Sequence, residues 1–427
     1  MIPEPRRISE GQPAHGLGKA AFRLPRVTMM NRIGVLGLML GVVVCPAVGA
    51  KVVESVEAFK EPIDVRHVII YHRADEFSAW PANHGLWSWD SGREILLGFV
   101  TGPFVEQEGH KIGTSRRQRL ARSRDSGETW TLLEPPGYVD FTRSPQPLAE
   151  PMDFTAPGLA LRVAADFTSP PGLYRSIDRG AIWDGPFEFV GLDAMPEIES
   201  LRSLTPRTDY QILGPNEALF LFSATSRSWE DRTFVIRTTD GGRSYSFLSW
   251  IVSPAEPYRA VMPQTVRLGH EEFFTLIRRR EPPNVEIETW IDGFRSIDGG
   301  KSWGPASRVA FTGFGNSNGN PPALIKLADG RLLTAYANRS LTMLLGRVSA
   351  DGGRTWGDEI VLREGFLSEF AGFADFGYPR LAERPDGKVF VAYYFATDAL
   401  PQQHIAGTIF SLDDLRDRTV TRSVHVR

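Results

Sequence analysis

The sequence predicts an all-β protein, a six-bladed β-propeller, on three observations. One eight-residue pattern recurs five times at intervals of 53 to 62 residues, a period that suits one four-stranded blade. A second pattern, two apolar strands joined by a turn, alternates with the first. No long helical pattern or linker interrupts the alternation, so we expect one propeller domain over residues 51–427.

The first repeat reads Ser/Thr-x-Asp-x-Gly-x-x-Trp/Tyr. Its copies are SRDSGETW from Ser123, SIDRGAIW from Ser176, TTDGGRSY from Thr238, SIDGGKSW from Ser296 and SADGGRTW from Ser349. The aspartate suits a tight turn, where it accepts backbone hydrogen bonds, and the glycine permits a positive φ there. The aromatic residue is expected to pack as a plug between neighbouring blades. The five aspartates are therefore predicted to be structural and not catalytic.

The second repeat predicts the inner two strands of successive blades, because alternating apolar residues around a glycine-containing turn are typical of a β-hairpin. Its copies begin at Gly85, Asp209, Met262, Asn320 and Tyr378, and residues 158–175 form a degenerate sixth. Six hairpins and five turn repeats give six blades, the last without a turn repeat. The strand VRHVIIY at residues 65–71 has no hairpin of its own. We expect it to complete the last blade and close the ring.

Composition excludes several classes of function. The net charge is −3 over 427 residues, so no basic field favours nucleic acid as a partner. Cys45 is the one cysteine, which leaves residues 51–427 without disulfides or a cysteine metal site. No acidic loop has the spacing of a metal site, and neither a metal nor another cofactor is predicted.

Residues 1–50 are predicted to be an N-terminal extension followed by a secretory signal peptide. Met29-Met30-Asn31-Arg32 precedes the apolar run 33–44, and small residues lead to a cleavage site after Ala50. The apolar run is too short to span a bilayer comfortably. We expect translation to start at Met29 or Met30, and the mature protein to be secreted or periplasmic without stable membrane insertion.

Candidate site residues lie at the start of each inner hairpin and just after its second strand, because propeller ligands bind at the central channel. They are Asn83, His84, Arg207, Arg278, Arg280, Arg339, Asp375, Tyr378 and Arg380. Arginines at matching places in several blades predict a cluster that binds a carboxylate through bidentate hydrogen bonds. Glu108 and His110, in the stretch after the first hairpin, are candidate proton carriers.

Together these segments resemble the sialidase (neuraminidase) superfamily, in which the eight-residue repeat is the Asp-box, or BNR repeat. The resemblance implies a glycoside hydrolase that releases a terminal anionic sugar of the sialic acid type. Tyr378, in Gly377-Tyr378-Pro379, would be the nucleophile. Arg278 and Arg339, with Arg280 and Arg380 nearby, would bind the carboxylate, while Asp375, Glu108 or His110 would move protons.

The chain departs from the family's pattern at three places. Ala79 replaces the arginine of the opening motif, although Arg73 lies six residues earlier. Met262 replaces the glutamate that would pair with the tyrosine, and no aspartate lies between the first hairpin and Asp125. Two other functions therefore stay open: a uronate polysaccharide lyase, which needs a cation, a base and an acid, and a non-catalytic glycan-binding propeller. Each of these functions has a glycan partner that carries an anionic sugar.

Overall fold

The computed structural model describes residues 51–138, 143–164, 170–226, 230–282, 287–314, 319–367 and 374–426. The predicted leader, residues 1–50 with Cys45, lies outside the described residues. The chain separates into a small unit of residues 1–52 and 425–427 and a large unit of residues 53–424. The large unit contains the predicted propeller.

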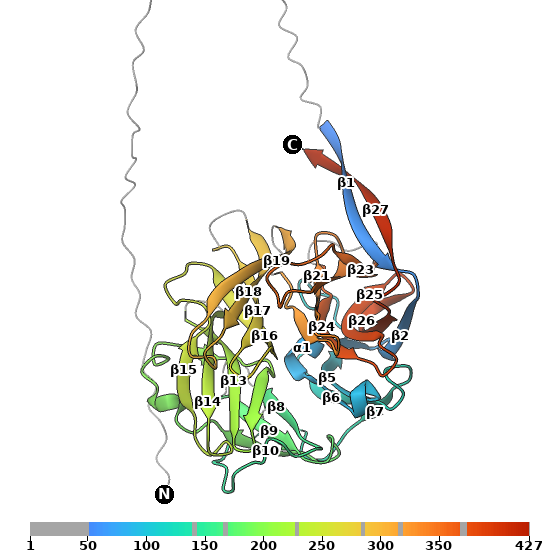
Figure 1. The fold of residues 1–427 in the computed structure, drawn as a ribbon. Coiled ribbons are helices and arrows are strands. Elements are labelled where there is room, and N and C mark those ends of the chain that lie inside the picture. The colour runs from blue at the N-terminus through green and yellow to red at the C-terminus, as the bar shows by residue number, and fades with distance from the viewer. Residues whose placement is uncertain are drawn as a thin grey trace, which may run out of the picture. The chain divides into compact units, whose positions relative to one another are not determined.

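Six sheets form the blades, and Figure 1 shows them around the short helix α1 (Pro81–His84). Blade 1 contains β3 (Glu76–Ala79), β4 (Leu86–Trp89), β5 (Glu94–Pro103), β6 (Arg117–Ser123) and β7 (Thr131–Leu133), with the 3-10 turn η1 (Asp90–Gly92). Blade 2 contains β8 (Ala160–Ala164), β9 (Gly172–Ser176) and β10 (Asp184–Glu188), followed by η2 (Leu192–Ala194). Blade 3 contains β11 (Ser203–Leu204), β12 (Tyr210–Gly214), β13 (Glu217–Thr225), β14 (Glu230–Thr238) and β15 (Ser246–Trp250).

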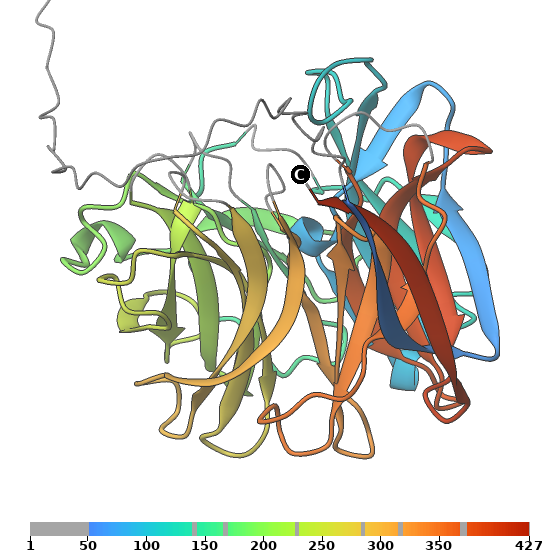
Figure 2. The same ribbon diagram turned by 90° about the horizontal axis from the view of Figure 1, so that it is seen from above.

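The remaining three blades follow the same order from the channel outward. Blade 4 contains β16 (Arg259–Arg267), β17 (Phe273–Arg280), β18 (Glu288–Ser296) and β19 (Gly304–Phe314). Blade 5 contains β20 (Ala323–Lys326), β21 (Leu332–Asn338), β22 (Met343–Ser349) and β23 (Ile360–Arg363), with β1 (Lys51–Pro62) and β27 (Leu415–Val426) added at its edge. Figure 2 shows β1 in dark blue beside β27 in dark red. Blade 6 contains β24 (Gly377–Glu383), β25 (Val389–Thr397), β26 (Leu400–Phe410) and β2 (Val65–Tyr71).

The predicted hairpins are confirmed, with one difference in blade 2. Hairpins β4–β5, β12–β13, β16–β17, β20–β21 and β24–β25 match the five clear repeats. The degenerate copy, residues 158–175, holds the β8–β9 hairpin. The repeated turn follows β9 directly, so β8 and β9 correspond to the second and third strands of the other blades. Blade 2 therefore has three strands among the residues described.

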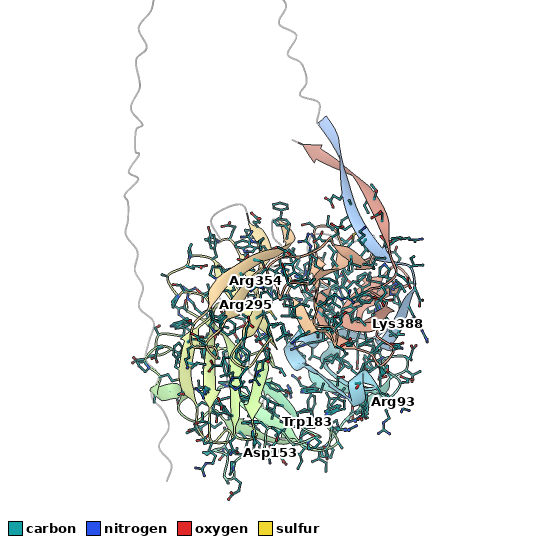
Figure 3. All side chains as sticks on the ribbon, in the orientation of Figure 1. Arg93, Asp153, Trp183, Arg295, Arg354 and Lys388 are labelled. Carbon is teal, nitrogen blue, oxygen red and sulfur yellow. The ribbon has the colours of Figure 1, made fainter. Side chains whose placement is uncertain are left out.

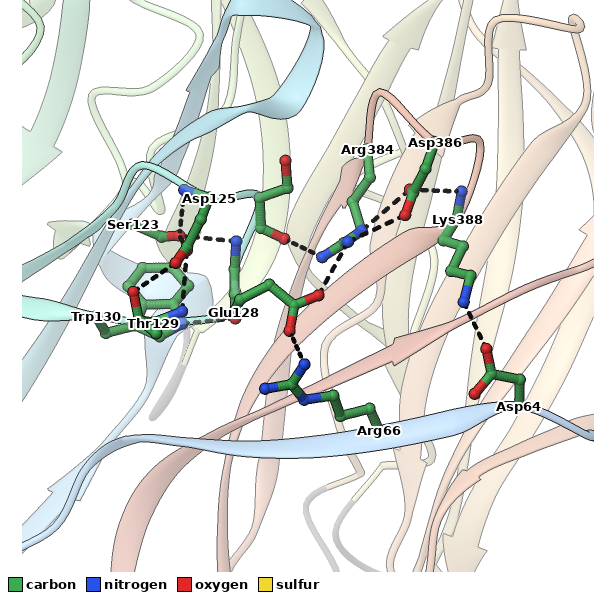
Figure 4. Close-up of polar contacts among 12 residues, drawn as sticks. Asp64, Arg66, Ser123, Asp125, Glu128, Thr129, Trp130, Arg384, Asp386 and Lys388 are labelled. Atoms are coloured by element: carbon green, nitrogen blue, oxygen red, sulfur yellow. Dashed lines mark hydrogen bonds and ion pairs between the residues drawn. The ribbon is translucent and has the colours of Figure 1, made fainter.

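The predicted ring closure is also confirmed. β2 pairs antiparallel with β26, from Val65 opposite Phe410 to Tyr71 opposite Ile405. Charged residues reinforce this junction (Figure 4): Arg384 of blade 6 donates to the Ser126 carbonyl at 2.5 Å and pairs with Glu128 of blade 1 at 3.0 Å. The first and last parts of the chain thereby complete one blade, which removes exposed sheet edges.

Apolar residues fill each of the six junctions between neighbouring blades. One cluster packs Leu219 and Val235 of blade 3 against Phe273 and Ile277 of blade 4. Five more clusters occupy the other junctions in the same way. Burial of this apolar surface stabilises the ring without disulfides.

The five repeated turns share one hydrogen-bond pattern. In the fourth copy the Ser296 hydroxyl donates to Asp298 at 2.8 Å and accepts from the Gly300 amide at 2.9 Å. The Ser302 amide donates to the same aspartate at 3.0 Å. The turn glycines have φ between 84° and 92°, and the aromatic residues pack between blades, as Trp183, labelled in Figure 3, does against Trp87 with ring centroids 5.4 Å apart.

We expect Asp298→Ala to impair folding and not chemistry. The substitution leaves the donors of Ser296 and Ser302 without their acceptor, which should cost about 1–3 kcal/mol of unfolding free energy. Burial alone would raise the pKa of Asp298, but these hydrogen bonds lower it, so the stabilisation is lost as the pH falls through the folded pKa. Thermal unfolding and activity per folded molecule are the measurements, with Asp298→Asn as the matched control. A variant of full stability that is inactive would contradict this assignment.

Candidate functional site

Four blades interrupt their innermost strand with a residue in the left-handed backbone region. These residues are Trp80 (φ 60°), Thr208 (φ 53°), Met262 (φ 58°) and Tyr378 (φ 52°). In blade 1 the interruption is α1, which lies between β3 and β4 although both strands pair with β5. A non-glycine residue in this region costs on the order of 1–3 kcal/mol, and such strain concentrates at functional sites. The four interruptions thus indicate where the site lies.

Tyr378 lies at the centre of the candidate site. Arg278 Nη1 donates to its hydroxyl at 3.2 Å, and the Arg339 guanidinium carbon lies 6.0 Å from its ring centroid. Its backbone amide donates to Asn320 Oδ1 at 3.1 Å, which fixes the strained conformation. Burial alone would raise the pKa of Tyr378, but Arg278 and Arg339 outweigh that effect and hold the pKa below its ordinary value. The Tyr378 hydroxyl therefore loses its proton more readily than that of an ordinary tyrosine.

Met262 lies where the resemblance places a glutamate. In the structure this position is close to Tyr378, because both residues contact Arg278. Arg278 Nη1 lies 3.3 Å from Met262 Sδ and contacts the Tyr378 hydroxyl with the same nitrogen. A thioether does not take up a proton, so Met262 does not serve as a base. Among the described residues, the lowering of the Tyr378 pKa therefore comes from the arginines and not from a neighbouring carboxylate.

A second group of residues connects Tyr378 to His110. Asp375 is buried, accepts from His110 Nδ1 at 2.8 Å and accepts from the Tyr394 hydroxyl. Arg339 Nη2 lies 3.7 Å from Asp375 Oδ1 and 3.2 Å from the Tyr394 hydroxyl. The Tyr394 ring meets the Tyr378 ring edge-on, with centroids 5.9 Å apart. The structure therefore brings together the predicted residues Tyr378, Asp375, His110, Arg278 and Arg339.

Two more arginines surround Glu230, Arg207 from the same blade 3 and Arg259 from blade 4. Arg207 pairs with Glu230, and Arg259 lies 3.4 Å from its other oxygen. Burial alone would raise the pKa of Glu230, but these arginines lower it. Burial, with Arg278 next, lowers the pKa of Arg259 to about 10, and the same two causes lower the pKa of Arg280. Because Arg278 depresses the pKa of both Arg259 and Arg280, positive charge is concentrated here, which favours an anionic ligand.

Arg380 lies in the channel and not beside the tyrosine hydroxyl. Its Nη1 donates to Gln264 at 2.7 Å, and its Nη2 donates to the backbone carbonyls of Ala82 and Arg207 at 2.5 and 2.8 Å. Through Nη1 and Nη2, Arg380 joins α1 to blades 3 and 4, while its Nε has no hydrogen-bond partner among the described residues. Asp209 lies beside it, and burial raises the pKa of Asp209 to about 7. A cavity of about 280 Å³ lies in this part of the channel.

His84 and Asn83 are carried by α1. His84 is buried, and burial with Arg162 and Arg207 nearby holds its pKa well below the ordinary value, so the imidazole is neutral. Asn83 is half-buried, and its Oδ1 has no hydrogen-bond partner among the described residues. Asn83 therefore keeps an unused, buried acceptor on α1 among the described residues.

Glu108 is not brought into the site. It is exposed in the segment between β5 and β6, and no described contact connects it to Tyr378 or Asp375. Arg73, considered as a substitute for the arginine missing at Ala79, is exposed and pairs with Asp75 at 3.2 Å. Of the proton carriers predicted in blade 1, His110 alone reaches the described site.

Sequence reasoning missed Glu230, Arg259 and Tyr394. Glu230 begins the third strand of blade 3, Arg259 begins β16, and Tyr394 lies near the end of β25. The predicted site residues all come from the ends of inner hairpins or from the loop after the first one, whereas third strands also begin near this site. A sequence feature that could have identified Glu230 is the group of charged residues that begins an otherwise apolar strand, as in EDRTFVIRT.

The described residues contain no group of three or more His, Cys, Asp or Glu side chains that could bind a metal ion. In the same part of the chain, no helix is long and apolar enough to cross a membrane.

Comparisons with known proteins show the fold. No family model matches the chain, and no curated protein matches it. A protein of unknown function from Dyadobacter fermentans matches with a TM-score of 0.60 and 21% identity, covering 84% of this chain and 99% of that one. An α-L-arabinanase of Penicillium chrysogenum matches with a TM-score of 0.51 and 14% identity, covering 82% and 99%. An α-L-arabinofuranosidase of Fusarium graminearum matches with a TM-score of 0.51 and 11% identity, covering 79% and 97%. The chain thus shares its propeller fold with these proteins.

Proposed function

We propose that the chain is an exo-acting glycosidase of sialidase type, which releases a terminal anionic sugar from glycans. The observation that carries the proposal is the contact between the Tyr378 hydroxyl and Arg278, in a site where arginines lower the tyrosine's pKa. The propeller glycosidases with the same fold are consistent with a glycan substrate. Arg278 and Arg339 would bind the carboxylate of the sugar, since guanidinium groups match carboxylates.

In the proposed first step, the deprotonated Tyr378 oxygen, a phenolate, attacks the anomeric carbon. An oxygen–carbon bond forms to the tyrosine, the glycosidic bond breaks, and the leaving oxygen takes a proton from His110. The Asp375 carboxylate accepts from His110 Nδ1, which leaves Nε2 to exchange that proton. In the second step His110 removes a proton from water, the water oxygen attacks the anomeric carbon, and the bond to Tyr378 breaks. The His110–Asp375 pair would thus replace the missing acid/base aspartate.

His110→Gln tests this assignment. We expect kcat to fall by about 10²–10⁴-fold with little change in KM, because general acid–base catalysis contributes that much to the rate. Steady-state kinetics measures both constants, and Glu108→Gln is the control in the same loop. Equal kcat values for wild type and His110→Gln would rule out this role for the histidine.

A uronate lyase is the second candidate, and Met262 favours it, because a lyase needs no carboxylate at that position. Arg278 would neutralise the substrate carboxylate, Tyr378 would remove the α proton, and His110 would protonate the leaving oxygen. A carbon–oxygen bond would break as a carbon–carbon double bond forms. The third candidate is a non-catalytic glycan-binding propeller. It is supported by Ala79, which replaces the arginine of the family's opening motif.

Product analysis distinguishes the three functions. Incubation with sialyl-lactose should release free sialic acid, detected by NMR. An ultraviolet-absorbing unsaturated product from a uronate polysaccharide would establish the lyase instead. Binding without turnover of either substrate would identify the binding propeller.

We also propose that the protein is exported, with cleavage after Ala50. N-terminal sequencing of the mature protein should begin at Lys51. A mature protein that retains residues 1–28 would refute the proposal.

A further inference from the structure

A second polar groove lies on the flank of blade 4. It has a volume of about 440 Å³ and is lined by Glu256, Tyr258, Arg279, Trp290, Asp292 and Arg308, among other residues. Successive residues of a strand point to opposite faces of its sheet. Arg279 therefore lies on the face opposite Arg278, which contacts Tyr378. The groove is thus separate from the site described above.

The floor of the groove holds an arginine whose donors are incompletely used. The Arg279 side chain is 2% exposed and pairs with Glu256 through Nη2, with Asp292 3.6 Å from its Nε. Its Nη1 has no hydrogen-bond partner among the described residues. A buried donor without an acceptor costs about 1–3 kcal/mol, so a ligand oxygen that reaches this nitrogen from the groove would recover that cost.

An aromatic pair forms one wall of the groove. Tyr258 is 36% exposed and meets Trp290 edge-on, with centroids 5.5 Å apart. Arg308 covers Trp290, with its guanidinium carbon 4.7 Å from the ring centroid, and donates to Asp292 at 2.6 Å. An exposed tyrosine ring offers an apolar surface against which the C–H face of a sugar ring can pack.

The charges of the lining determine the class of ligand. Glu256 pairs with Arg279 and Asp292 pairs with Arg308, so the two carboxylates and two guanidinium groups balance. A charge-balanced lining does not favour an anion, whereas carboxylates accept from hydroxyl groups and guanidinium nitrogens donate to sugar oxygens. A few convergent polar groups beside an aromatic wall, in a groove of this size, are typical of a small-molecule site.

We propose that this groove binds a neutral sugar unit of a glycan. The inference is independent of the reaction at Tyr378, because the groove uses none of its residues. Saturation-transfer NMR on the full chain tests it with the methyl glycosides of glucose, galactose, mannose, xylose and arabinose as probes. At least one glycoside should show transfer, and the transfer should persist in Tyr378→Phe.

Two substitutions locate the binding. Tyr258→Ala and Glu256→Gln should each weaken the affinity by about tenfold or more, since each removes a direct ligand contact. Phe314→Ala is the matched control, because Phe314 is an exposed aromatic residue of the same blade outside the groove. Thermal unfolding verifies that the variants are folded. The proposal is wrong if no glycoside shows transfer, if transfer is unchanged in Tyr258→Ala, or if only sulfate or glucuronate binds there.

Discussion

Tyr378→Phe is expected to lower kcat by roughly 10³-fold or more while leaving substrate binding nearly intact. The substitution removes the one atom that would form the covalent bond to the sugar, and it keeps the ring that packs against Tyr394. Loss of an interaction made in the chemical step appears in kcat and not in the dissociation constant. Turnover and product binding, measured separately, give the two quantities.

Tyr394→Phe is the matched control for this variant. Its hydroxyl donates to Asp375 and lies in the same network, but it does not contact Arg278 in the described structure. We expect a smaller loss of kcat for this control than for Tyr378→Phe. If Tyr378→Phe keeps near-normal turnover, the centre of the proposed site is misassigned.

Arg278→Ala is expected to weaken binding of an anionic sugar by about 2–5 kcal/mol and to lower kcat as well. The binding loss follows from removing a buried charged partner of the carboxylate. The kcat loss follows because Arg278 is the first of the cations that lower the pKa of Tyr378. Titration with the free anionic sugar measures the first effect, and steady-state kinetics measures the second.

The pH dependence of activity tests the effect of Arg278→Ala on Tyr378 more specifically. Without this cation the pKa of Tyr378 rises, so any limb of the profile that reports tyrosine deprotonation should move to higher pH. Arg279→Ala is the neighbouring control, because Arg279 pairs with Glu256 on the opposite face of the blade. A profile that shifts equally in both variants would contradict a direct effect on Tyr378.

The ring itself could be predicted from the sequence because its determinants are local and repeated. Each turn copy carries its own acceptor, glycine and aromatic plug, so each of the five blades that has a copy can be recognised without knowledge of its neighbours. The closing strand β2 followed from the apolar segment 65–71 that had no hairpin partner. Blade 2 differs because the residues before β8 carry no comparable apolar pattern.

The site could be predicted only in part, because its geometry depends on interruptions of the inner strands. The positive φ of Tyr378 shifts the β24–β25 register between Gly377 and Arg380, and Arg380 then lies in the channel. Simple alternation from Tyr378 would have placed both residues on the same side. Glu230 and Arg259 were missed for a different reason, since they interact electrostatically with Arg278 from separate strands that share no sequence pattern.

The most direct test of the central claim is to trap the sugar on the enzyme. A difluoro analogue of sialic acid, with fluoride as leaving group and a second fluorine that slows hydrolysis, should leave a covalent adduct. Peptide mapping by mass spectrometry should place that adduct on the peptide carrying Tyr378, and Tyr378→Phe should not form it. Hydrolysis of sialyl-lactose with an adduct on another side chain, or with none, would contradict the proposal that Tyr378 attacks the anionic sugar.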